Sequence, residues 1–116
     1  MDRAQAVSLI SASIAKGTGS PFVGVEDRDA AVEEAGRNLL SDVIEPYQVR
    51  VTSASFPEYD FEQFSSCSVY AIAGQADHLL LYCPSSGKFA LGWGEDHQEI
   101  QMLGFATGDA LAEWRG

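Results

Sequence analysis

Cysteine is scarce in this chain, and its scarcity excludes two kinds of small fold. The 116 residues include only Cys67 and Cys83, and no CxxC pair occurs. A scaffold held by several disulfides therefore cannot form, and neither can a zinc site with four cysteine ligands. The length suits a single domain, residues 1–116, that folds around one hydrophobic core.

Long hydrophobic runs are also missing. No apolar stretch approaches the roughly 20 residues that a membrane-spanning helix needs. The segment from Ala4 to Ala15 is moderately apolar, but polar side chains interrupt it, so a signal peptide is not expected. We therefore expect a cytoplasmic protein that does not bind membranes.

Positively charged residues are also few. Seven Lys and Arg residues stand against 17 Asp and Glu residues, which gives a formal net charge of −10. The isoelectric point is near 4.3. Nucleic acid and anionic membrane surfaces are repelled at long range by such a protein. The charge favours a basic protein as the partner.

Apolar spacing predicts two N-terminal helices. Val7, Ile10 and Ile14 recur at intervals of three and four residues, which is the spacing of one helical face. A second helix is predicted from about Asp27 to Val43. Its apolar face comprises Val32, Ala35, Leu39 and Val43. We expect these side chains to pack on a sheet.

After Pro46 the hydrophobic period changes to two, which is typical of strands. Strands are predicted at residues 47–52, 68–73, 78–83 and 88–93, with a short further strand at 99–105. Pro84 and Gly87 indicate a tight turn, and Thr107 or Asp109 is expected to cap a last helix. The predicted fold is α+β, with an antiparallel sheet of about four strands, two N-terminal helices and a short C-terminal helix.

An acidic loop offers the best candidate for metal or hydrolytic chemistry. Glu95, Asp96 and Glu99 surround His97, and all are acceptable ligand types for a hard or borderline metal. The spacing matches neither a calcium loop nor a zinc hydrolase motif, so a solvated loop is the better interpretation. No cofactor or metal is expected, although a small enzyme centred on His97 remains an alternative.

The segment from Phe56 to Phe64 alternates acids with aromatics. In an extended chain Glu58, Asp60 and Glu62 project to one side, while Tyr59 and Phe61 project to the other. Such a strip can dock on a basic partner, with acids steering and aromatics giving contact area. The alternative is that the aromatics enter the core.

The candidate partner-binding residues are therefore Glu58, Tyr59, Asp60, Phe61, Glu62, Glu95, Asp96 and Glu99. Exposed charges contribute little to stability, so reversing the charges of Glu58, Asp60 and Glu62 is expected to weaken binding and leave folding intact.

The two cysteines are expected to face each other. If a hairpin closes through residues 74–76, Cys67 lies opposite Cys83 on the neighbouring strand. A reducing compartment keeps such thiols unbonded, and we expect both to be buried as small hydrophobic side chains.

Residues 79–93, 103–105 and 109–114 predict an apolar hairpin with a tryptophan-bearing strand, an acidic loop and a short closing helix. This C-terminal third resembles the corresponding part of bacterial SUKH-type immunity proteins. The resemblance implies an α+β protein that binds and neutralises a toxin without chemistry of its own.

The leading hypothesis is thus a small acidic protein-binding module, of the immunity type, that neutralises a basic toxin. An acidic secretion chaperone or an assembly subunit is the alternative within the same broad class, and the enzyme at His97 is the alternative from another class.

Overall fold

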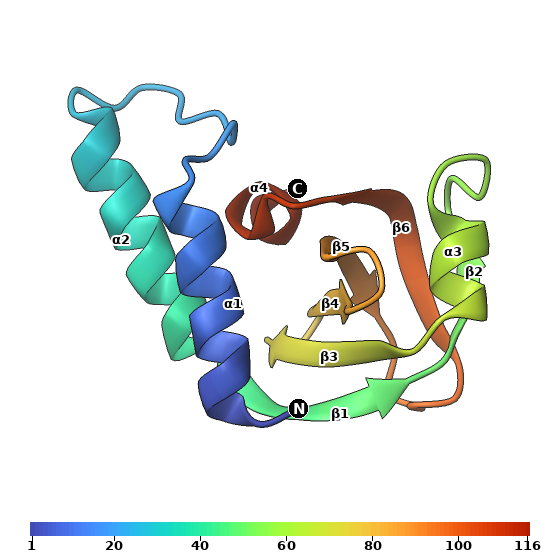
Figure 1. The fold of residues 1–116 in the computed structure, drawn as a ribbon. Helices are drawn as coiled ribbons and strands as arrows, with labels where there is room; N and C mark the ends of the chain where they lie inside the picture. The colour runs from blue at the N-terminus through green and yellow to red at the C-terminus, as the bar shows by residue number, and fades with distance from the viewer.

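The computed structural model describes all residues from Met1 to Gly116 and combines helices with one sheet (Figure 1). The elements in chain order are α1 (Arg3–Ala15), α2 (Arg28–Ser41), β1 (Val43–Val49), β2 (Val51–Ala54), α3 (Phe61–Ser66), β3 (Val69–Gly74), β4 (Leu79–Cys83), β5 (Lys88–Trp93), β6 (Ile100–Thr107) and α4 (Ala110–Arg115). The predicted α+β class is confirmed. None of these helices has the length and hydropathy needed to cross a bilayer.

The sheet differs from the predicted one in size and in strand direction. It has six strands in the order β1-β3-β4-β5-β6-β2, and the β2–β6 pair is parallel while the other pairs are antiparallel. The prediction of about four antiparallel strands was wrong chiefly because the single strand predicted at residues 47–52 is two strands, β1 and β2, which meet at Arg50 and pair at opposite edges of the sheet. β2 and β6 are separated in sequence by α3 and three strands, so their pairing has no local signal.

Arg50 joins the two edges of this sheet. The segment before it, β1, pairs with β3, and the segment after it, β2, pairs with β6. The backbone N–H of Arg50 donates to the carbonyl of His97 at 2.7 Å, and its carbonyl accepts from the N–H of Ile100 at 2.9 Å. Because one residue connects both edge strands, the sheet has to curl, and Figure 1 shows the strands bent around a central space.

The curled sheet has a hydrophobic cluster on each face. The inner cluster lies within the curl and is closed by α3; it comprises Val49, Val51, Phe64, Val69, Ala71, Leu79, Leu81, Cys83, Ala90, Ile100, Met102 and Ala106. The outer cluster lies under α1, α2 and α4; it comprises Ala6, Ile10, Leu39, Val43, Ile72, Ala73, Leu80, Tyr82, Phe89, Ala110 and Leu111. All five residues of β4 are buried, because its side chains alternate between the two clusters.

The helices begin where the sequence supplies caps. Asp2 and Gln5 form a reciprocal capping box at α1, with both hydrogen bonds at 2.8 Å. Asp27 caps α2, and Asp109 caps α4 as predicted. The predicted extension of the second helix to Val43 is wrong, because α2 ends at Ser41 and Val43 pairs with Ala73 in the sheet.

The remaining predictions for the core are largely confirmed. Leu39 of α2 is fully buried and Val32 on the same helix face is half-buried. In the strands predicted at residues 68–73, 78–83 and 88–93 the apolar side chains are buried, except that Tyr70, Leu91 and Trp93 are half-buried. The turn at Pro84–Gly87 forms as expected, with Gly87 at a φ of +71° and its N–H bonded to the carbonyl of Cys83.

The predicted pairing of the cysteines is wrong. The hairpin register pairs Tyr70 with Tyr82 and Ala71 with Leu81, which places Val69, and not Cys67, next to the end of β4. Cys67 follows the last residue of α3 and is half-buried. Both thiols are free, and only Cys83 is fully buried.

Gly104 permits a close approach between β6 and the loop before α3. Its φ is +131°, and a Cβ at this position would overlap the carbonyl oxygen of Phe56. Gly104→Ala is therefore expected to lower the free energy of unfolding by about 2 kcal/mol or more, measured by urea denaturation.

Gly108 provides the matched control for this substitution. It is exposed, and a Cβ there meets nothing within 4 Å. Gly108→Ala is expected to change the free energy of unfolding by less than about 0.5 kcal/mol. Equal effects of the two substitutions would contradict the proposed close approach.

Candidate functional site

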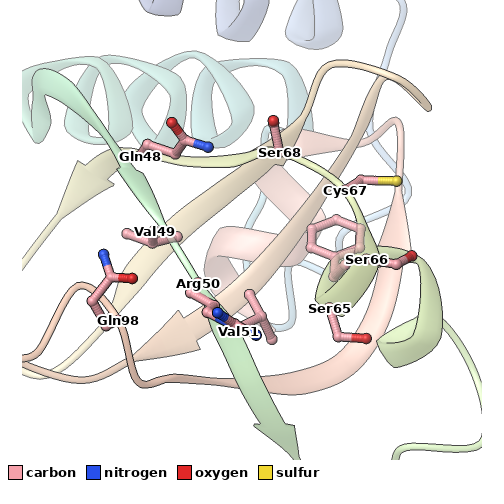
Figure 2. A pocket seen from close by; sticks show the side chains of 10 residues that line it. Gln48, Val49, Arg50, Val51, Ser65, Ser66, Cys67, Ser68 and Gln98 are labelled. Atoms are coloured by element: carbon pink, nitrogen blue, oxygen red, sulfur yellow. The ribbon is translucent and has the colours of Figure 1, made fainter.

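A polar pocket of about 400 Å³ opens where β1 passes into β2 (Figure 2). Figure 2 shows Gln98 on one side of the β1–β2 segment and the stretch from Ser65 to Ser68 on the other. The lining residues are Gln48, Val49, Arg50, Val51, Phe64, Ser65, Ser66, Cys67, Ser68 and Gln98. Sequence reasoning did not find this pocket, because its walls come from three separate segments, residues 48–51, residues 64–68 and Gln98.

The pocket contains hydrogen-bonding groups but no catalytic pair. Its lining includes no Asp, Glu or His. The hydroxyls of Ser65 and Ser66 donate to the carbonyl of Glu62 at 3.0 and 2.8 Å, within their own helix. Cys67 therefore has no general base beside it in the pocket wall. The pocket can hold a small polar molecule but supplies no means of activating a nucleophile.

The acid–aromatic segment is not the extended strip that its alternation predicts. Residues from Phe61 onward form α3, which turns Phe61 partly inward against the inner cluster and leaves Glu62 exposed. The helix forms because Phe64 fills the inner cluster. Glu58 and Tyr59 remain exposed in the preceding loop, as predicted.

Asp60 is bonded within the protein and stabilises the loop before α3. Its carboxylate accepts a hydrogen bond from the N–H of Ala106 at 2.8 Å. The same carboxylate forms an ion pair with Nζ of Lys88 at 3.3 Å. The N–H of Asp60 donates to the carbonyl of Gly104 at 2.9 Å. These bonds hold the loop before α3 against β6, so the expectation that the charge of Asp60 can be reversed without cost to folding requires correction.

Three exposed aromatic side chains gather on this loop and on the outer side of β6. We call Phe56, Tyr59 and Phe105 the aromatic surface. The ring of Phe105 lies 5.3 Å from that of Phe56 and 4.6 Å from that of Tyr59, measured between centroids. Their exposed fractions are 43%, 59% and 37% for Phe56, Tyr59 and Phe105, although folding normally buries such side chains. The three rings therefore form one exposed apolar patch.

Phe105 is the member that sequence reasoning missed. Along β6 the inward residues are Ile100, Met102, Gly104 and Ala106, so Phe105 belongs to the outward set. An aromatic side chain at an outward position of an alternating strand was the signal available in the sequence. Its partners could not be identified there, because they lie more than 40 residues earlier in the chain.

The acidic loop around His97 lies at the other end of β6. Glu95, Asp96 and Glu99 are exposed, and the Asp96 carboxylate accepts from the N–H of Gln98 at 2.9 Å. The His97 ring stacks on Tyr47, with centroids 3.9 Å apart. No group of three His, Cys, Asp or Glu side chains in the chain lies close enough to hold a metal ion.

The two groups of predicted binding residues therefore do not form one site. Glu95, Asp96 and Glu99 precede the first residue of β6, whereas Asp60 is bonded near its last residues. An eight-residue strand spans roughly 25 Å. A partner that contacts the aromatic surface and Glu58 need not reach the acidic loop.

A further carboxyl group, Glu113 of α4, lies at the same end of β6 as Asp60. Thr107 donates its hydroxyl to this carboxylate at 2.9 Å. Burial raises the pKa of Glu113, and the nearby charges of Asp109 and Asp60 raise it further, against the opposing effect of the Thr107 hydrogen bond.

No protein-family model, curated protein or solved structure matches the chain. The functional interpretation therefore rests on the residues of this molecule.

Asp60 is expected to stabilise the fold, in contrast to its neighbour Glu62. Asp60→Ala leaves the N–H of Ala106 and the ammonium of Lys88 without their partner and should lower the free energy of unfolding by about 1 to 3 kcal/mol. Glu62→Ala, at an exposed side chain, should change it by less than about 0.5 kcal/mol. Urea denaturation of both variants measures the difference, and similar stabilities would show that Asp60 does not anchor the loop.

Glu113 makes part of the stability depend on pH. Its pKa is higher in the folded protein than in the unfolded chain, so this group lowers the free energy of unfolding as pH rises from the ordinary glutamate value through the raised one. Glu113→Gln removes this loss and keeps an acceptor for Thr107.

The variant should therefore gain stability over the wild-type protein as pH rises through that window, and the gain should be constant above it. Thermal denaturation measured across the pH range tests this, with Glu34→Gln on the exposed side of α2 as the control for loss of one negative charge. A difference between Glu113→Gln and wild type that does not vary with pH would refute the raised pKa.

Proposed function

We propose that this protein is a small acidic protein-binding module that contacts a basic protein through the aromatic surface. The observation that carries the proposal is the gathering of Phe56, Tyr59 and Phe105 on the exterior, with ring centroids 4.6 to 5.3 Å apart. Large aromatic side chains supply much of the binding energy in protein interfaces. Their exposure in the free protein is accounted for if a partner covers them.

Two unpaired carboxylates that are close to Phe56 and Tyr59 in the chain give this part of the surface negative charge. Glu58 lies between Phe56 and Tyr59 in the chain, and Glu62 lies in the first turn of α3. Both are exposed, and neither belongs to an ion pair of the protein, because the nearby Lys88 is bound to Asp60. With a net charge of −10, the protein attracts a basic partner over long range and orients it by these local charges.

The loop is held in place before any partner arrives. The N–H of Phe56 donates to the carbonyl of Leu103 at 2.9 Å, and that of Asp60 donates to Gly104 at the same distance. Binding therefore requires little ordering of the backbone, which favours affinity.

A toxin is the partner within this proposal. The resemblance of the C-terminal third to SUKH-type immunity proteins favours it, and many toxins that act on nucleic acid need a basic surface for their substrate. An acidic protein that covers such a surface neutralises the toxin without chemistry of its own.

Affinity capture from the native host tests the proposal. Immobilised wild-type protein should retain one or a few basic proteins at low salt. It should release them at about 0.5 M NaCl, where interactions between charges are screened beyond a few ångströms. A double variant, Tyr59→Ser with Phe105→Ser, should lose the same proteins by quantitative mass spectrometry, after circular dichroism confirms that it is folded.

Val23→Ser provides the matched control, because Val23 is 94% exposed and lies in the loop between α1 and α2, outside the aromatic surface. This variant should retain the partner. If the double variant captures the same proteins as wild type, or if the captured proteins are acidic, the proposal is wrong. Where the partner inhibits growth when expressed alone, co-expression of wild type, but not of the double variant, should restore growth.

A further inference from the structure

The rings of the aromatic surface carry no cation from the protein itself. The two contacts between an arginine and an aromatic ring in the structure both involve Phe22, with Arg115 at 4.0 Å and Arg28 at 5.4 Å from its centroid. Lys88, the cation bonded to the loop of the aromatic surface, is held by Asp60. The ring faces of the aromatic surface are therefore open to a cation from outside.

The ring geometry leaves these faces accessible. Phe105 stands between the other two rings, and the interplanar angles are 38° with Phe56 and 36° with Tyr59. Tilted rings do not cover one another completely, and all three side chains keep more than a third of their surface exposed. The faces of aromatic rings carry partial negative charge and attract cations placed over them.

Two carboxylates without a partner lie close to these rings in the chain, Glu58 between Phe56 and Tyr59 and Glu62 three residues after Tyr59. Glu58 and Glu62 make no side-chain hydrogen bond or ion pair within the protein, whereas Asp60 between them is fully engaged. A ligand group that stacks flat on a ring and hydrogen-bonds to a carboxylate would use both the open ring faces and the unpaired carboxylates. The planar guanidinium of arginine does this, because it stacks on ring faces and donates paired hydrogen bonds to carboxylates. The ammonium of lysine is a compact, strongly hydrated charge and stacks less well.

We propose that the aromatic surface, together with Glu58 and Glu62, is a binding site for arginine side chains, so that the partner presents an arginine-bearing segment to it. This inference rests on the proposed function and specifies the chemistry of the partner at that site.

Defined peptides test the inference on the full-length protein. The probes are a flexible peptide rich in glycine and serine that carries several arginines, the same peptide with lysines, and the same peptide with citrullines, which keep the shape of arginine without its charge. Isothermal titration calorimetry at low ionic strength measures their affinities. The arginine peptide should bind, the lysine peptide should bind several-fold more weakly, and the citrulline peptide should not bind measurably.

Variants separate the contribution of the rings from that of the charges. Tyr59→Leu keeps an apolar side chain and removes the ring, and it should lower affinity for the arginine peptide about fivefold. It should affect the lysine peptide less. Glu58→Gln with Glu62→Gln should weaken both charged peptides, whereas Glu34→Gln, at an exposed acid of α2, should leave both nearly unchanged.

Three results would overturn the inference. The first is equal affinity for the arginine and lysine peptides with no effect of Tyr59→Leu, which would show attraction by net charge alone. The second is loss of binding in Glu34→Gln as large as in the Glu58 and Glu62 variant, which would place the site elsewhere. The third is the absence of any preference for arginine peptides in a protein that does capture a basic partner. In that third case, wild type captures a basic partner and the aromatic double variant does not, yet arginine peptides are not preferred. This result overturns the inference and leaves the proposed function standing. Failure of that capture overturns the proposed function.

Discussion

Closure of the sheet through Arg50 is the constraint on which the rest of the structure depends. Its N–H and its carbonyl are bonded to the loop before β6 and to the first residue of β6, so β1 and β2 must pair with opposite ends of the strand order. The resulting curl creates an inner face that is filled by side chains and closed by α3. The outer face is left for α1, α2 and α4.

The same closure explains why the aromatic surface exists. Once β6 is paired with β5 and β2, its inward positions must be apolar, and Gly104 allows the backbone at Phe56 to approach the strand closely. The outward position next to it, Phe105, then meets the aromatic side chains of that loop. The positions of the exposed rings therefore follow from the geometry of β6 and of the loop before α3. Asp60 fixes the register between this loop and β6.

Local features of the fold could be predicted from the sequence, and long-range ones could not. The helix at α1, the turn at Pro84–Gly87 and the strand at Lys88–Trp93 follow from spacing and turn residues within a few positions. The parallel β2–β6 pair and the role of Asp60 depend on residues that approach only after the sheet closes. The hairpin register was predicted wrongly because the connecting loop spans residues 75–78, with Gly74 paired to Leu79, whereas the prediction closed the hairpin through residues 74–76. Of the candidate site, Glu58, Tyr59 and Glu62 could be identified as exposed residues, but Phe105 and the pocket at Arg50 could not.

The acidic residues divide into two groups, and the division determines which of them can act on a partner. Seven of the eight aspartates accept a hydrogen bond within the protein: Asp2, Asp27, Asp42, Asp60, Asp77, Asp96 and Asp109. The short aspartate side chain suits bonds to nearby backbone N–H groups, as in helix caps and turns. Among the nine glutamates only Glu33 and Glu113 have such a partner. The longer glutamate side chains therefore supply most of the unpaired negative charge of the protein, and Glu58 and Glu62 are the two that lie within three residues of Tyr59 in the chain.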